Sequence, residues 1–268
     1  MIGLGAFTVF ALGLRHGADP DHLAAIDNLT RNSYDRKPWL SRFCGTLFAG
    51  GHSVMVLSIA AIVGLLGARF AAHGALIETI GTWISIVVLV AIAIVNLQQL
   101  RSGATRIRGA KTRLLPRALR EAESPWLAVP VGLLFGFGFE TSSQIATYAV
   151  AFGANSGLAG ALLVGVAFCL GMIVTDTLDS VLVHRLVSDR TSMRPRAARL
   201  WIVAVTTLAL VVAAYELAQV LGWITASASL DLDFSVAIVV TLLAVFAYVF
   251  FETKRGRSIP TTQSDTTL

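Results

Sequence analysis

The chain has 268 residues, of which 55% are hydrophobic and only 14% charged, and its mean hydropathy is +0.73. Soluble domains usually carry about 25% charged residues, so this composition excludes an ordinary water-soluble protein and predicts a membrane protein. The net charge of +5 does not indicate nucleic-acid binding, because the basic residues lie between apolar runs rather than on one face.

Seven apolar runs follow one another along the chain, and each is close to the roughly 20 residues that a membrane span needs. They cover residues 2–28, 43–67, 79–100, 126–150, 157–183, 200–223 and 234–251. This pattern predicts an all-α fold, a polytopic transmembrane helical bundle of about seven spans. We expect residues 1–268 to form one integral membrane domain, with a basic cytoplasmic loop at 101–124 and a cytoplasmic tail at 252–268.

The loops between these runs differ in charge. Nineteen of the 21 Lys and Arg residues follow the first, third, fifth or seventh run, and Arg31 is among those after the first. The alternate loops carry only Arg69, and the last of them is acidic through Asp231 and Asp233. By the positive-inside rule we expect a multi-pass protein of the inner (plasma) membrane, with the N-terminus outside and the C-terminus in the cytoplasm. His73 and His184 are expected in loops.

Short similarities link the two halves of the chain. Residues 47–52 read LFAGGH and residues 167–172 read AFCLGM, while HLA at 22–24 corresponds to QIA at 144–146. Three spans separate the partners, so the two halves would have opposite topology. Inverted repeats are common in transporters, and we therefore hypothesise a 3+3 inverted repeat plus one helix.

Ionisable residues are unusually dense inside the apolar runs. Each costs about 2.5–3.5 kcal/mol at membrane depth on insertion scales, so their clustering indicates a functional site. They are Arg15, His16, Asp19, Asp21, His22, Asp27, His52, Glu140, Asp176, Asp179 and Glu216.

The densest group lies in the first run. His16, Asp19 and His22 are spaced by three residues and would share one helix face. Asp21 would lie off that face in a straight helix, but Pro20 is expected to bend the chain and bring it inward. Two imidazoles and two carboxylates form a mixed nitrogen and oxygen site that suits nickel, cobalt, copper or zinc better than magnesium or calcium.

Each of these ionisable residues also has an interpretation that involves no bound metal. The cluster could be a structural polar core, and His52 could be a packed histidine bonded across helices. Glu140 could carry a proton or join two helices. Asp176 and Asp179 could attract the cation, or could pair with an arginine.

The same residues resemble the nickel/cobalt transporter family (NiCoT, the high-affinity nickel-transport proteins). The family signature R-H-A-x-D-A-D-H-I-A-A-I-D-N corresponds to RHGADPDHLAAIDN at residues 15–28. Three further blocks follow in the family's order, GGHS at 50–53, FGFETSSQ at 137–144 and GMIVTDTLD at 171–179. Gly17, Pro20, Glu140 and Gln144 depart from the family pattern. The family typically has eight helices, and this chain is expected to begin at the second.

The resemblance implies roles for individual residues. His16, Asp19, Asp21 and His22 would recognise the metal, together with His52. Glu140, Thr141, Asp176 and Asp179 would lie on the transport pathway.

The function expected from these observations is secondary transport of nickel and/or cobalt across the inner membrane, most simply as uptake. The partners are then the divalent metal ion and the lipid bilayer, with no nucleic acid and no cofactor besides the transported ion. A phosphate-binding loop is absent from the sequence, so no ATPase subunit is implied. The alternatives are nickel or cobalt efflux and, with less support, an intramembrane metalloenzyme. The HExxH protease motif is absent and the histidines are too few for a histidine-rich di-iron centre, so no enzyme is expected.

Overall fold

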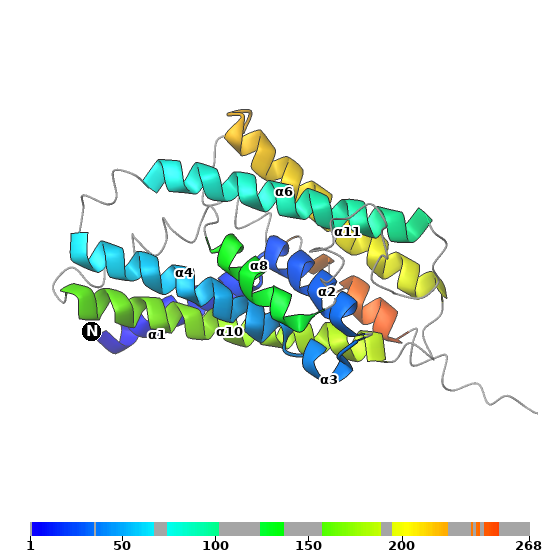
Figure 1. Cartoon of the computed structure of the whole chain (residues 1–268), viewed down its shortest axis with the longest axis horizontal. Coiled ribbons are helices and arrows are strands. Elements are labelled where there is room, and N and C mark those ends of the chain that lie inside the picture. The colour runs from blue at the N-terminus through cyan, green and yellow to red at the C-terminus, as the bar shows by residue number, and fades with distance from the viewer. Residues whose placement is uncertain are drawn as a thin grey trace, which may run out of the picture.

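The computed structural model describes residues 2–34, 36–66, 74–101, 124–136, 157–188 and 195–224, together with 237, 240, 241 and 244–251. Every regular element within these residues is helical (Figure 1). The helical fold class expected from the sequence is therefore confirmed for the described part of the chain.

Four long helices dominate the structure. They are α4 (Cys44–Leu66), α6 (Gly74–Arg101), α10 (Gly157–Ser188) and α11 (Pro195–Val220). Among the described residues, these four are long and apolar enough to cross a membrane. They correspond to the second, third, fifth and sixth apolar runs. α10 has 32 residues and therefore extends for about 48 Å, which exceeds the roughly 30 Å of the hydrocarbon core.

The first apolar run forms two helices where one span was expected. α1 (Ile2–Gly17) ends three residues before Pro20, and α2 (Pro20–Tyr34) begins with it. Proline is favoured at the first position of a helix, where its missing N–H is not needed, but it cannot continue one from the preceding turn. The bend predicted from Pro20 is thus a complete break.

α2 also continues beyond the predicted end of the run at Asn28. Arg31, expected in a cytoplasmic loop, lies within α2 and is only 1% exposed. The expectation was wrong because an arginine paired with a carboxylate one turn earlier can remain inside the protein.

The other described helices are short. α3 (Pro38–Ser41) links α2 to α4, and the 3₁₀ helix η1 (Pro125–Leu127) leads into α8 (Ala128–Phe135). Together, η1 and α8 form the beginning of the fourth predicted run, and residues 137–150 of that run lie outside the described residues. For the seventh run, residues 244–251 are helical.

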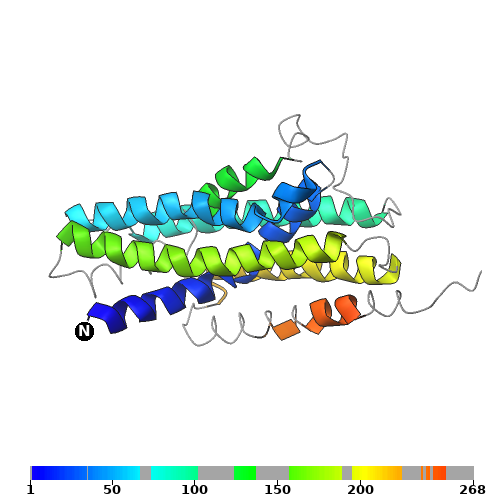
Figure 2. The same ribbon diagram turned by 90° about the horizontal axis from the view of Figure 1, so that it is seen from below.

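The long helices alternate in direction. In Figure 1, α4 and α11 run one way along the bundle, and α6 and α10 run the other way. α10 packs closely against α4 and α1, while α6 packs against α11; Figure 2 shows α10 lying alongside α4 with α1 below it.

Glycines allow α1 and α10 to approach closely. A Cβ atom at Gly13 would overlap the backbone carbonyl of Phe168, and one at Gly171 would overlap that of Phe10. Small residues at such crossings are typical of helix packing in membranes.

α2 lies at the centre of the packing. It contributes Ala24 to an apolar cluster with α6, α10 and α11, and Ala25 and Ile26 to another with α4 and α8. The outward faces of the long helices expose large apolar side chains instead, such as Val87 on α6 and Leu170 on α10. Polar side chains carried by α2 are therefore placed between the surrounding helices and away from the apolar outer surface.

Candidate metal centre

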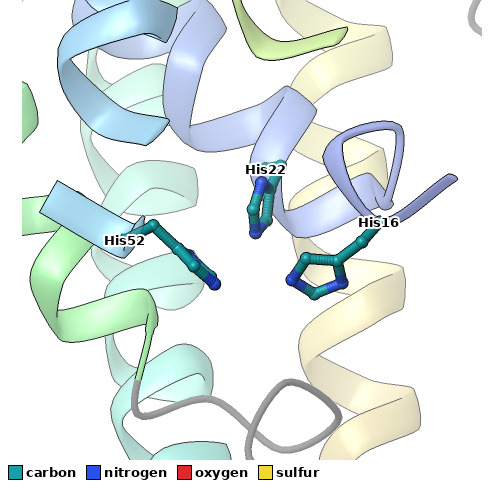
Figure 3. A group of neighbouring side chains, drawn as sticks. All are labelled: His16, His22 and His52. Atoms are coloured by element: carbon teal, nitrogen blue, oxygen red, sulfur yellow. The ribbon is translucent and has the colours of Figure 1, made fainter. Parts of the chain in front are cut away.

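Three histidines meet at the break between α1 and α2. His16 comes from the last turn of α1, His22 from the first turn of α2 and His52 from the middle of α4. Figure 3 shows their rings pointing toward one another. The ring centroids of His16 and His22 are 4.7 Å apart, those of His22 and His52 4.9 Å, and those of His16 and His52 5.3 Å. The three side chains are 7%, 1% and 0% exposed, respectively.

This imidazole cluster (His16, His22 and His52) has dimensions that suit a metal ion. Each ring offers one nitrogen, and these three atoms lie within 4.8 Å of one another. Nitrogen ligands bind a first-row divalent ion at about 2.1 Å and then lie about 3–4 Å apart. The three rings therefore need to move inward by about 1 Å to bind one ion together.

Two aspartates hold the histidines from behind. The Nδ1 of His16 lies 2.8 Å from Oδ2 of Asp19, and the Nδ1 of His22 lies 3.3 Å from Oδ1 of Asp176 on α10. An ionised carboxylate can only accept, so a neutral imidazole beside it donates through Nδ1 and has Nε2 as its acceptor nitrogen. A carboxylate behind the imidazole is the usual support of a histidine that binds a metal.

The structure describes two of the other residues predicted for the site, Asp21 and Asp179. Asp21 accepts a hydrogen bond from the backbone N–H of His22, 2.9 Å from its Oδ1. Asp179 lies one turn beyond Asp176 on α10. Glu140 and Thr141 lie outside the described residues.

Aromatic rings close the cluster on several sides. Phe48 of α4 and Phe135 of α8 lie beside His22, with ring centroids 4.9 and 6.2 Å from it, and Phe168 of α10 lies 5.3 Å from His16. All three phenylalanines are buried. Sequence reasoning missed them because a phenylalanine in an apolar run carries no signal of its neighbours. These rings exclude water, which strengthens electrostatic interactions between the site and a cation.

Comparison with known proteins agrees with this chemistry. The family described as "High-affinity nickel-transport protein" matches residues 2–108 and 102–251. The chain belongs to this family. Its resemblance at residues 15–28 is thereby extended over most of the chain.

Several curated proteins are related to the chain. A "High-affinity nickel transport protein" of Cryptococcus neoformans is 32% identical over 68% of this chain and 44% of its own length. A "Nickel transporter NixA" of Staphylococcus aureus is 32% identical over 68% of this chain and 61% of its own. A "Cobalt transport protein NhlF" of Rhodococcus rhodochrous is 34% identical over 66% of this chain and 58% of its own. The chain spans about half the length of these relatives. No solved structure matches it.

A second buried polar group lies further along α2. Asp27 accepts hydrogen bonds at both oxygens, from Nε1 of Trp201 on α11 (2.7 Å to Oδ1) and from Nε of Arg31 (2.7 Å to Oδ2). Nη2 of Arg31 also lies 2.6 Å from Asp27 and donates to Oδ1 of Asn96 on α6 at 3.2 Å. We call Asp27, Arg31, Asn96 and Trp201 the anchor cluster, because it joins α2 to α6 and α11. Its charges cancel, so it does not need a cation.

His184 also differs from expectation. It was placed in a loop, but α10 continues to Ser188 and includes it. Its Nδ1 lies 2.9 Å from Oγ of Ser41, which itself donates to the carbonyl of Pro38. His184 therefore donates to Ser41 and ties α10 to α3, far from the imidazole cluster.

Proposed function

We propose that this protein is a secondary transporter that takes up Ni²⁺ or Co²⁺ across the inner membrane, and that His16, His22 and His52 bind the ion on its way. The observation that carries the proposal is the convergence of three buried imidazoles, two of them backed by carboxylates, at a helix break. The names of the relatives, which are nickel and cobalt transport proteins, support the choice of metal.

The ligand chemistry agrees with this cargo. Imidazole nitrogens suit nickel, cobalt, copper and zinc, whereas magnesium and calcium prefer oxygen ligands. The carboxylates of Asp19 and Asp176 supply two negative charges next to the rings, which match the charge of a divalent cation. The centre would therefore be close to neutral when the ion is bound.

The arrangement of helix ends supports the proposed orientation with seven spans. α4 begins just after Arg42, α6 ends at Arg101, α10 carries Arg185 near its end and α11 carries Arg199 near its start. Because the helices alternate in direction, all four basic ends lie at one end of the bundle, opposite the N-terminus (Figure 1). By the positive-inside rule this end faces the cytoplasm.

An inverted repeat would relate α4 to α10, and these two helices run in opposite directions and pack side by side (Figure 1). In this orientation α10 runs toward the cytoplasm, so Asp179 lies one turn beyond Asp176 on the cytoplasmic side. We place Asp176 and Asp179 on the pathway of the ion, together with Glu140 and Thr141.

The membrane potential supplies a driving force for uptake. An inside-negative potential favours inward movement by about 2.3 kcal/mol per charge per 100 mV, hence about twice that for a divalent cation. Export would need a coupled ion to overcome this term. Uptake is therefore the direction that needs no further energy source.

The test is transport of radiolabelled nickel into right-side-out vesicles with an imposed inside-negative potential. We expect accumulation that cobalt inhibits, that collapses with the potential, and that His52→Ala abolishes while His184→Ala does not. Accumulation in inverted vesicles driven by a proton gradient would instead establish export. Normal uptake by His52→Ala would remove the imidazole cluster from the mechanism.

A further inference from the structure

A cavity of about 170 Å³ lies between α2, α10 and α11, separate from the imidazole cluster. Ala18 and Leu23, on either side of the segment that carries Asp19 and His22, form part of its wall. The rest is mostly aliphatic and aromatic, with Leu182, Leu208 and Phe246 among the lining side chains.

Three polar side chains reach the cavity. Asp27 is fully engaged by Trp201 and Arg31, and the hydroxyl of Thr175 donates to the carbonyl of Leu14 at 2.9 Å. Asp179 differs from both. Its Oδ2 is buried and has no hydrogen-bond partner within the part of the chain that the structure describes. The cavity therefore offers an unpaired carboxyl oxygen, and the indole N–H of Trp201 in its wall is already donated to Asp27.

The transported metal passes Asp179 in the proposed function, but this cavity does not offer it a complete set of ligands. A first-row divalent ion needs at least three or four nitrogen, oxygen or sulfur ligands. Of the two carboxylates in the lining, that of Asp27 already accepts hydrogen bonds at both oxygens, and Asp179 has an oxygen to spare. A hydrated ion would have to place its water shell against leucine and phenylalanine side chains, which cannot accept hydrogen bonds. A ligand that fits this cavity should therefore have a small cationic group and an otherwise apolar surface.

We propose that this cavity is a binding site for a small organic ammonium ion with an apolar body about the size of a benzene ring. Ligand pockets commonly combine apolar walls with a few polar groups that fix the orientation. An apolar cavity of about 150 Å³ is known to hold one benzene molecule, so the available volume suits a single ring. The ammonium group donates to Asp179, and the ring lies against Leu182, Leu208 and Phe246.

The position of the cavity gives the ligand a consequence for transport, which rests on the proposed function. The occupant contacts α2 beside the segment that carries His22, and it contacts α10 and α11 as well. It therefore holds α2 in its present position relative to these helices, while leaving the imidazole cluster accessible to metal. Such a ligand slows nickel uptake, because it occupies Asp179 on the proposed pathway, and it leaves nickel binding to the imidazole cluster unchanged.

The experiment measures binding to the purified protein in lipid nanodiscs by calorimetry, with benzylammonium as the probe. Benzyl alcohol has the same body without the charge, and methylammonium has the charge without the body. We expect saturable binding of one benzylammonium per chain, at least tenfold tighter than either comparison compound. Equal affinity for benzyl alcohol would overturn the role of Asp179, and absence of saturable binding would overturn the site.

Three variants locate the ligand. Asp179→Asn should weaken benzylammonium at least tenfold and leave benzyl alcohol unchanged, and Leu208→Trp should abolish binding by filling the cavity. The matched control is Leu210→Trp, two residues along α11 at a side chain that is 42% exposed, which should bind like the natural protein. The thermal unfolding temperature of each variant, measured by circular dichroism, reports whether the protein is folded. Unchanged benzylammonium binding by either Asp179→Asn or Leu208→Trp would show that the ligand lies elsewhere. If the proposed function fails but this binding persists, the cavity site stands on its own.

Discussion

Two buried polar clusters share helix α2, and they differ in whether their charges are matched within the protein. In the anchor cluster, the carboxylate of Asp27 is satisfied by Arg31 and Trp201. In the imidazole cluster, three rings converge so that one nitrogen of each lies within 4.8 Å of the others, and the nearby carboxylates bond to two of the rings. The first arrangement is complete without a ligand. We propose that the second is completed by a cation that lies between the rings.

An ionisable residue in a membrane span therefore has to be interpreted together with the residues that it contacts. His22 and Asp27 are five residues apart on one helix, and both are almost fully buried. Nevertheless, one faces α4 and α10 at the site, and the other faces α6 and α11 in the anchor. We infer that the anchor cluster fixes the position of α2, so that His22 meets His16 and His52 in register. Buried ion pairs are weak sources of net stability, and fixing a position is a role they can fulfil.

The largest expected effect is the loss of metal binding when one imidazole is removed. His22→Ala leaves two rings, and the nickel affinity of the purified protein should fall by more than about 100-fold, because losing a direct ligand costs more than losing an outer partner. The thermal unfolding temperature should change little, since the anchor cluster is untouched. Calorimetry with nickel measures the first quantity and a thermal scan in detergent the second.

His184→Ala is the matched control, because this histidine bonds to Ser41 outside the imidazole cluster. Its nickel affinity should equal that of the natural protein. If His22→Ala also kept its affinity, the imidazole cluster would be a structural polar core like the anchor cluster, and the contrast between the two would disappear.

Breaking the anchor cluster should have the opposite effect, a loss of stability with nickel affinity largely kept. Asp27→Ala leaves the buried guanidinium of Arg31 without its carboxylate, which should cost about 3–5 kcal/mol in the free energy of unfolding. The double variant Asp27→Leu with Arg31→Met removes both charges and should regain most of this loss. Nickel affinity, measured on the folded fraction of the double variant, should stay within about threefold. If the double variant were as unstable as Asp27→Ala, the Asp27–Arg31 pair would stabilise the fold by more than the cancellation of its two charges.

The carboxylates behind the rings should have intermediate effects. Asp176→Asn keeps the size of the side chain but removes the charge that supports His22, and nickel affinity should fall by about 10–100-fold. Thr177→Val is a neighbouring control on α10, because Thr177 bonds to Thr46 instead of the site. Equal affinity in Asp176→Asn and Thr177→Val would mean that Asp176 does not support the metal ligand.

The two clusters should also differ in how they respond to pH. Histidine binds a metal only in its neutral form, and free imidazole titrates near pH 6.5, so protons compete with nickel as the pH falls. Between pH 7.5 and 5.5 the affinity should drop by more than about tenfold. Arginine stays charged throughout this range, so the anchor cluster should not respond. Calorimetry in buffers of different ionisation enthalpy counts the protons released; affinity that is constant with pH would exclude the histidines as direct ligands.

Much of the helical framework was predictable from the sequence, because apolar length and composition are local properties. The second, third, fifth and sixth runs match α4, α6, α10 and α11 to within a few residues. The break at Pro20 was also foreseen as a bend, since it follows from the chemistry of proline. Spacing by three residues correctly made His16 and Asp19 neighbours. It could not tell that the ring of His16 lies beside those of His22 and His52, with Asp19 bonded to its Nδ1.

The contacts between distant segments could not be read from the sequence. His52 joins His16 and His22 only through the packing of α4, and Asp176 reaches His22 across 154 residues of chain. Arg31 was misplaced because it follows the apolar run, although its spacing of four from Asp27 was the available signal for a pair. Trp201 gave no signal, since an indole in an apolar run does not reveal its hydrogen-bond partner.

The smallest expected effect tests whether the two clusters are truly separate. Trp201→Phe keeps an aromatic ring against Phe246 but removes the Nε1–H that donates to Asp27. One oxygen of Asp27 is then left without its donor, at a cost of about 1–3 kcal/mol in the free energy of unfolding. This is less than for Asp27→Ala, because the bond to Arg31 persists. Trp126→Phe, at a tryptophan that is 58% exposed, controls for the change of ring and should leave the free energy of unfolding nearly unchanged.

The nickel affinity of Trp201→Phe tests the separation of the clusters directly. If the anchor cluster only holds α2 in place, and Arg31 suffices to hold it, this affinity should change by less than about threefold. A loss comparable to that of Asp176→Asn would show that small shifts of α2 reach the imidazole cluster, and the two clusters would then have to be treated as one coupled site.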